Sequence, residues 1–204
     1  MLKNIFFELT KKYTGDLLLI QTRWTEIEKK YSDTKRHYHT LFHLENLISQ
    51  LEEVKNQIVD WDIILFAVFY NDIIYKSTKT NNEEKSAELA TKRLHEINFP
   101  QNKISGCAAL ILATKKHLQT GNSDTDLFTD ADLSILGQSW DQYAVYCKQI
   151  RKEYSIYPDL IYKPGRKKVV NHFLRMDRIY KSDYFYKKFE LQAKENLLRE
   201  LESL

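Results

Sequence analysis

The sequence predicts an all-α protein, a compact single-domain helical bundle over residues 1–204. Only 5 Gly and 3 Pro occur in 204 residues, which leaves little turn chemistry for a many-stranded fold. Hydrophobic residues make up 43% and charged residues 29% of the chain, a balance that supports a packed core. Apolar residues recur at helical spacing in most segments, and we expect about nine or ten helices.

The first half of the chain contains the clearest amphipathic segments. A third helix is expected over 40–56, after a polar entry at 32–37. Residues 61–75 are apolar nearly all round, as is typical of a helix buried at the centre of a bundle. One face of a long second helix carries Leu17, Ile20, Trp24, Ile27 and Tyr31.

Capping and turn residues divide the middle of the chain. Asn81 and Asn82 are suited to cap the next helix, and Pro100 marks a stop or a first turn. Residues 104–117 are apolar enough to be largely buried, and the polar stretch 119–126 predicts a loop. The helix between Asn82 and Pro100 carries Ala87, Ala90, Leu94 and Ile97.

Helices are expected over 130–136 and 140–154 in the last third of the chain. Residues 158–165 are expected to interrupt the chain because they contain two prolines and a glycine. A new apolar stripe then comprises Val169, Phe173, Met176 and Tyr180, and the terminal helix carries Phe189, Ala193, Leu197 and Leu201.

Composition excludes several classes of protein. The formal net charge of +3 is small beside 31 basic and 28 acidic residues, which argues against a bulk electrostatic nucleic-acid binder. Cys107 and Cys147 lack ligand spacing and are expected to be core residues in a reducing compartment. Residues 61–75 are too few to span a bilayer, and the N-terminus lacks a signal-peptide pattern. We therefore expect a cytoplasmic protein with no membrane partner.

Three of the six histidines lie in RHYHTLFHL at 36–44. His39 and His43 are four residues apart, so on a helix both point the same way, one turn apart. One helix can offer two imidazoles to a metal or a phosphate in this way. The alternative is a surface histidine pair stacked on Phe42 or Tyr38.

Asn71 and Asp72 lie within the apolar run FAVFYNDIIY. Because an ionised carboxylate buried without a partner costs several kcal/mol, Asp72 must meet a cation, a metal or several donors. The alternative makes Asp72 a structural hydrogen-bonding residue near the helix end, with help from Asn71.

Asp130 and Asp132 alternate with small and apolar residues in TDADLSILG at 129–137, directly after the expected loop. Viewed locally, they would be an N-cap and a first-turn acid, which stabilise a helix by roughly 1 kcal/mol.

Taken together, these segments resemble the HD superfamily of predicted metal-dependent phosphohydrolases, and most closely a small bacterial subgroup of about this length. The resemblance rests on several stretches that occur in one order and cover most of the chain. They are RHYHTLFHLENLI, AVFYNDIIY, NNEEKSAELA, LATKKH, DADLSILG, YAVYCKQIRKEY, the GR at 165–166 and KENLLRELESL.

The resemblance implies an HD-type helical bundle that holds a divalent cation such as Mn²⁺, Mg²⁺, Fe²⁺ or Ni²⁺. By position, His39 is the first ligand, Asp72 the acid of the His-Asp pair and Asp132 the last ligand. It implies hydrolysis of a small phosphate ester or a nucleotide, with Asp72 orienting or deprotonating a water. Asp130 would be a cap or an outer neighbour of the ligands.

Four further residues are implied near the same cavity. His43 and His117 correspond to polar residues specific to the subgroup. Arg36 and Arg151 are candidates for a phosphate, since guanidinium forks match its oxygens.

Asn71 stands where the family has the histidine of its name-giving pair. An amide oxygen can bind a hard cation, but it is a poorer ligand than imidazole for transition metals. Either the site binds metal weakly, or it recruits His43 or His117, or it has lost metal and catalysis. The competing hypothesis is therefore a catalytically impaired protein that binds a nucleotide or a protein partner without turnover.

A separate basic segment, KPGRKK, occupies 163–168. Basic residues at an expected helix start oppose the helix dipole, and a nearby anion would relieve them. The alternative is a solvated basic turn. No aromatic stacking pattern accompanies the segment, so nucleic-acid binding is not inferred.

Overall fold

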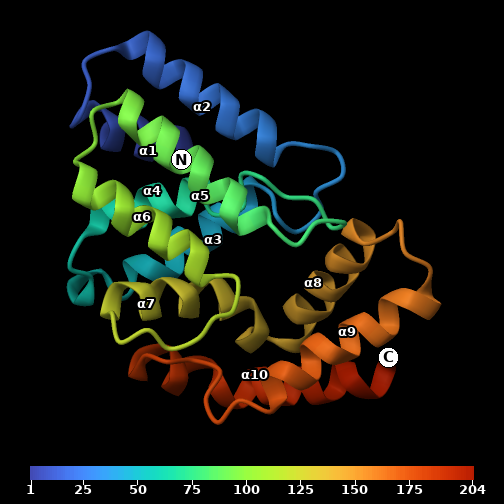
Figure 1. Ribbon diagram of the computed structural model, residues 1–204. Coiled ribbons are helices and arrows are strands. Elements are labelled where there is room, and N and C mark those ends of the chain that lie inside the picture. The colour runs from blue at the N-terminus through green and yellow to red at the C-terminus, as the bar shows by residue number, and fades with distance from the viewer. The chain divides into compact units, whose positions relative to one another are not determined.

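The computed structural model describes all 204 residues and contains helices without any strand, which confirms the all-α class. Figure 1 shows the course of the chain. The ten α-helices are α1 (Leu2–Lys11), α2 (Leu17–Tyr31), α3 (Leu41–Glu52), α4 (Trp61–Tyr70), α5 (Asn82–Glu96), α6 (Gln101–Ala113), α7 (Ser123–Asp132), α8 (Trp140–Glu153), α9 (Asp159–Leu174) and α10 (Asp183–Ser203). Two 3₁₀ helices are η1 (Lys55–Gln57) and η2 (Leu133–Gly137).

The chain divides into two compact units, Met1–Thr129 and Asp130–Leu204. Helix α7 begins in the first unit and its last residues belong to the second. A single domain stays a prediction.

Helix α4 forms the centre of the first unit, where α1, α3, α5 and α6 all contact it. Every residue from Ile64 to Tyr70 is buried, as the uniformly apolar sequence predicts. Full burial of one such side chain stabilises the fold by about 1.5–3 kcal/mol. Helix α2 buries the predicted face through Ile20, Trp24, Ile27 and Tyr31, whereas Leu17 is exposed.

Helices α9 and α10 pack together in the second unit, and η2 packs against α8 and α10. Helix α10 buries Phe189, Ala193 and Leu197, as predicted. Gly137 ends η2 directly against the backbone of Phe189, so that any side chain at this position would collide with α10. No helix in the chain is both long enough and apolar enough to cross a bilayer.

Two predicted helices are shorter than expected. Helix α3, expected over 40–56, begins at Leu41 because Thr40 is extended, with φ −112° and ψ −179°, and it ends at Glu52, shortly before the separate 3₁₀ helix η1. The buried helix expected over 61–75 ends at Tyr70, and Asn71 is its C-terminal cap. Asp72 therefore lies just beyond the helix and not within it.

The expected loop at 119–126 is wrong in its second half. Helix α7 begins at Ser123 because the Asn122 side chain accepts from the N–H of Thr125 at 2.9 Å. The polar residues that predicted a loop therefore form the N-terminal cap and the first turn of α7. Asp130 consequently lies at the end of α7 and is not an N-cap.

The interruption expected at 158–165 is also wrong, because α9 begins at Asp159 and continues through Pro164. A proline near the N-terminus of a helix removes few internal hydrogen bonds. Of the predicted stripe, Tyr180 is buried and Phe173 and Met176 are half-buried, whereas Val169 is exposed and its neighbour Val170 is buried instead.

Candidate metal centre

His39 and His43 do not share a helix, contrary to the sequence prediction. His39 precedes the extended Thr40, and His43 lies in the first turn of α3. The bend before the helix nevertheless brings the two imidazoles together, with ring centroids 5.8 Å apart. Proximity therefore arises from a turn and not from helical periodicity.

Helices α3 and α4 bring His43 to Asp72. The Nε2 atom of His43 lies 3.5 Å from Oδ2 of Asp72. The His43 side chain is 5% exposed and that of Asp72 is 20% exposed. A shielded imidazole thus faces a carboxylate that keeps an opening to solvent.

The backbone around Asp72 is held by Tyr31, the last residue of α2, and by Arg36, which follows that helix. The Asp72 N–H donates to the Tyr31 hydroxyl at 3.1 Å. Arg36 donates to the carbonyls of Asp72 at 2.7 Å, of Ile73 at 3.0 Å and of His39 at 3.2 Å. Arg36 therefore ties the histidine segment to the end of α4, and three of its donors are committed to backbone.

The pKa of the Asp72 carboxyl lies below its usual value. Burial opposes ionisation, but the charge of His39, the hydrogen bond and charge of His43, and the charge of Arg36 outweigh it. Asp72 is therefore ionised at neutral pH, the state in which a carboxylate binds a cation.

The Asn71 amide is oriented by two neighbours. Its Nδ2 donates to Oδ2 of Asp72 at 3.3 Å, and its Oδ1 accepts from the Thr114 hydroxyl at 3.1 Å. The same hydroxyl also lies 2.7 Å from the carbonyl of Ile111. Since a hydroxyl carries one hydrogen, turning the amide over would let Nδ2 donate to Thr114 and direct Oδ1 toward Asp72. That second orientation is the one a cation beside Asp72 favours.

An aromatic contact fixes His39. Its ring stacks on Tyr75 with centroids 4.1 Å apart and an interplanar angle of 30°. Tyr31, Tyr75 and Thr114 were not among the predicted site residues. A tyrosine or threonine in a helical pattern carries no spacing signal, and only the fold reveals that these side chains orient the predicted ones.

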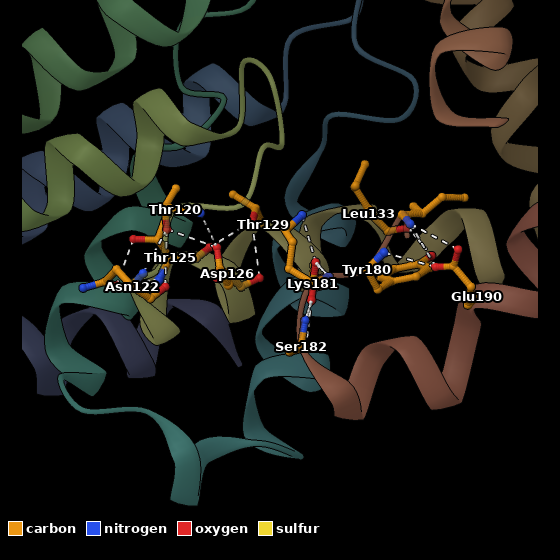
Figure 2. A network of polar contacts seen from close by, with 12 residues as sticks. Thr120, Asn122, Thr125, Asp126, Thr129, Leu133, Tyr180, Lys181, Ser182 and Glu190 are labelled. Carbon is orange, nitrogen blue, oxygen red and sulfur yellow. Dashed lines mark hydrogen bonds and ion pairs between the residues drawn. The ribbon is translucent and has the colours of Figure 1, made fainter. Parts of the chain in front are cut away.

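Polar contacts anchor the start of α7 within the first unit. Asp126 accepts from the N–H and the hydroxyl of Thr120, both at 3.0 Å, as Figure 2 shows. The Asp124 carboxylate accepts from the N–H groups of Val59 and Asp60, at 2.8 and 2.9 Å, just before α4. The helix that ends at Asp132 is thereby tied to the first unit at its other end.

The first unit brings the imidazole of His43 and the carboxylate of Asp72 together as neighbouring potential ligands of a cation. An imidazole and a carboxylate together suit Mn²⁺, Fe²⁺ or Zn²⁺. These two donors therefore fit a divalent cation. Asp132, at the end of α7, belongs to the second unit, and its role as the last ligand stays a prediction.

Asp130 has a different environment. It is fully buried and accepts from the N–H groups of Lys181 and Ser182, at 3.0 and 2.7 Å, and from the Ser182 hydroxyl at 2.7 Å. The Lys181 ammonium lies 2.9 Å from the same carboxylate. Figure 2 shows Lys181 and Ser182, the residue that caps α10. Asp130 thus holds the start of α10.

The remaining predicted residues are placed as follows. Arg151 lies in α8, pairs with Asp159 at 2.7 Å and donates to the carbonyls of Tyr154 and Tyr157 within the second unit. His117 follows α6 in a left-handed conformation with φ 51°. The phosphate role of Arg151 and the pocket role of His117 stay predictions.

Comparisons of the chain with protein-family models, curated proteins and solved structures found no match.

Proposed function

We propose that the chain is a metal-dependent phosphohydrolase of the HD type, acting on a small phosphate ester or a nucleotide. The observation that carries the proposal is the contact of His43 with Asp72 in the first unit, with the imidazole of His39 beside His43. Asp132 completes the ligand set by the resemblance. In this assignment His43 is a metal ligand in place of Asn71. His39 is an adjacent imidazole held by Tyr75.

The chain's own residues prepare this chemistry. Asp72 stays ionised beside two imidazoles and Arg36, so it can bind a cation and orient a water. A divalent cation held there would supply a Lewis acid for a phosphoryl oxygen and would lower the pKa of a bound water toward about 7. Tyr31 and Arg36 fix the backbone of Asp72, which limits the reorganisation needed during reaction.

The proposal is tested by metal analysis of protein purified without chelator, followed by a phosphatase screen with Mn²⁺ and Mg²⁺. We expect about one cation per chain and turnover that chelation abolishes. Asp72→Asn should abolish both metal binding and turnover. Asp16→Asn, which changes a helix cap remote in sequence, should leave metal binding and turnover intact. Absence of both metal and turnover in the wild type would contradict the proposal.

A second candidate function is binding of a nucleotide without turnover. It is favoured by Asn71, whose amide oxygen faces Thr114 and whose amide nitrogen faces Asp72. In this orientation the residue offers no ligand atom to a cation. Calorimetric titration with nucleotides, with and without Mn²⁺, separates the two functions because a binding protein would show affinity with no product.

A further inference from the structure

The strongest charge asymmetry of the chain lies outside the candidate metal centre. Residues 145–175 contain eight basic and two acidic residues, an excess of six positive charges. The remainder contains 23 basic and 26 acidic residues, an excess of three negative charges. Both acidic groups of the basic segment are engaged, because Asp159 pairs with Arg151 and Glu153 is buried. Arg166 is buried and paired with Glu200, so the cationic region that the small overall charge conceals consists mainly of exposed lysines on α8 and α9, namely Lys148, Lys152, Lys167 and Lys168.

An exposed aliphatic cluster lies at the corner where α8 leads into α9. Ile156 is 69% exposed, Leu160 87% and Ile161 57%. These side chains occupy the connecting segment and the first turn of α9, which Figure 1 shows as the corner between the two helices. Exposing three large aliphatic side chains together has a free-energy cost in water, and such clusters mark contact surfaces.

The exposed face of α9 changes character along its length. Leu160 and Ile161 begin it, Pro164 follows one turn later, and Lys167 and Lys168 follow after a second turn, all of them exposed. At 1.5 Å per residue, Lys167 lies about 10 Å along the helix from Leu160. The helix thus has an aliphatic tip and a cationic band two turns behind it.

We propose that this corner docks on an anionic membrane surface, with Ile156, Leu160 and Ile161 entering the lipid and Lys167 and Lys168 meeting the headgroups. Interfacial segments bury apolar side chains about 5–10 Å deep, which is the spacing between the tip and the lysine band. Side chains that protrude from a corner need no matching cavity in a fluid apolar phase. Docked in this way, α9 enters the interface with its first turn leading, and the lysine band stays at the headgroups.

Other occupants fit these observations less well. Pairing this face with a second copy would bring two like-charged lysine bands together, which is unfavourable. A nucleic acid would use the lysines but would leave the aliphatic cluster in water, because its phosphate backbone offers no apolar surface.

The test is flotation of the full chain with vesicles of phosphatidylcholine alone or with about one third phosphatidylserine. We expect binding to the anionic vesicles, little binding to the neutral ones, and a decline as salt rises. Each lysine near an anionic surface contributes about fivefold to partitioning, so Lys167→Glu with Lys168→Glu should weaken binding at least tenfold. Leu160→Ser with Ile161→Ser should weaken it by at least as much.

Matched controls come from exposed residues of the first unit. Leu18→Ser with Val59→Ser changes two equally exposed aliphatic side chains, and Lys29→Glu with Lys30→Glu reverses two exposed lysines of α2. Neither pair should alter vesicle binding, and thermal melts should show that all variants stay folded. Sedimentation measures self-association, and a duplex DNA titration measures polyanion binding.

Three results would overturn the proposal. One is no binding of the wild type to anionic vesicles, and another is equal loss in the corner and control variants. The third is binding that depends on the lysines but is unaffected by the aliphatic variants, because the corner would then serve a soluble polyanion.

Discussion

Asp130 and Asp132 are two residues apart in the sequence, yet their surroundings give them different tasks. Asp130 is fully buried and holds Lys181 and Ser182, whereas Asp132 is half-buried and is the last ligand of the proposed metal site. Residues two apart on a helix point to nearly opposite faces, so one aspartate can serve the fold while the other serves a site.

We predict that Asp132→Ala lowers the affinity for Mn²⁺ at least tenfold with a small change in stability. Asp130→Ala should instead destabilise the fold by about 3–5 kcal/mol, because it removes a buried carboxylate that pairs with the Lys181 ammonium and accepts from the N–H groups of Lys181 and Ser182. Calorimetric titration measures the first effect and chemical denaturation the second. A larger loss of metal affinity in folded Asp130→Ala would reverse the assignment.

Asn71→His is predicted to strengthen binding of Mn²⁺, Fe²⁺ or Ni²⁺. An imidazole beside Asp72 would add a ligand, and a gain of about tenfold or more corresponds to about 1.4 kcal/mol. Because Asn71 is 2% exposed, the larger side chain should also cost about 1–3 kcal/mol of stability. Titration and metal-free thermal melts measure the two effects separately.

Thr114→Val is the matched control for this experiment, since it removes the hydroxyl that faces the Asn71 oxygen without adding a ligand. It should leave metal affinity below that of Asn71→His. If Asn71→His binds no more metal than the wild type while folded, the binding function without turnover becomes the better proposal.

At the scale of elements, the apolar patterns predicted which helices exist. The helix ends predicted from polar residues and prolines were wrong in several places. The buried faces of α2 and α10 follow from period alone, because each is a regular stripe against a core. Asn122 and Pro164 were interpreted as breaks, but one caps α7 and the other lies within α9. Such residues are compatible with a turn or with a helix start, and long-range packing decides between them.

The candidate site shows the same division between local and long-range information. The sequence indicated His43, Asp72 and Asp132 as neighbours of one site only through a resemblance, because no local period links them. It could not indicate that His39 stacks on Tyr75 or that Tyr31 accepts from Asp72, since α2, α3 and α4 must pack before these atoms meet.

Helices α2 and α5 are joined by an ion-pair network that should make stability depend on pH. Arg93 donates two bonds of 2.8 Å to the Glu26 carboxylate, and Arg23 donates a third of 3.0 Å. Burial alone would raise the pKa of Glu26, but these hydrogen bonds outweigh it, and the pKa lies below its usual value. The network's contribution is therefore fully present above the unfolded pKa of about 4.3 and is lost as pH falls through the lower folded value.

Glu26→Gln should consequently cost about 1–3 kcal/mol at pH 7, and the difference from the wild type should shrink below pH 4. Thermal melts between pH 3 and pH 7 measure this. Glu28→Gln, an exposed change in the same helix, is the control and should change stability by less than about 0.5 kcal/mol. A pH-independent difference between Glu26→Gln and the wild type would show that the charge of Glu26 does not stabilise the fold.

At the scale of the whole molecule, the two units differ in what they bury. The first unit is the longer one, yet it buries two Asp, Glu or Arg residues, Arg36 and Asp126. Those of the second are Asp130, Glu153, Arg166, Glu190 and Glu200. The shorter unit has less apolar surface to bury, and its helices are joined by paired charges within its core.

The central pair of the second unit is Arg166 of α9 with Glu200 of α10. Two bonds of 2.8 and 2.9 Å link them, and the Tyr143 hydroxyl of α8 donates to the same carboxylate. Both charged side chains are less than one tenth exposed. Three helices thus meet at one carboxylate, and loss of that charge leaves a buried guanidinium without compensation.

Glu200→Gln is therefore predicted to destabilise the second unit by about 3–5 kcal/mol. Replacing both partners, as Arg166→Met with Glu200→Leu, should cost less than the sum of the single changes, because no unpaired charge is left behind. Arg178→Gln breaks the exposed pair with Asp183 in the same unit and should cost less than about 1 kcal/mol. Chemical denaturation of the wild type, Arg166→Met, Glu200→Leu and the double variant gives the coupling energy of the pair directly. If Glu200→Gln costs no more than Arg178→Gln, the core of the second unit does not depend on this pair, and its apolar contacts alone hold the three helices together.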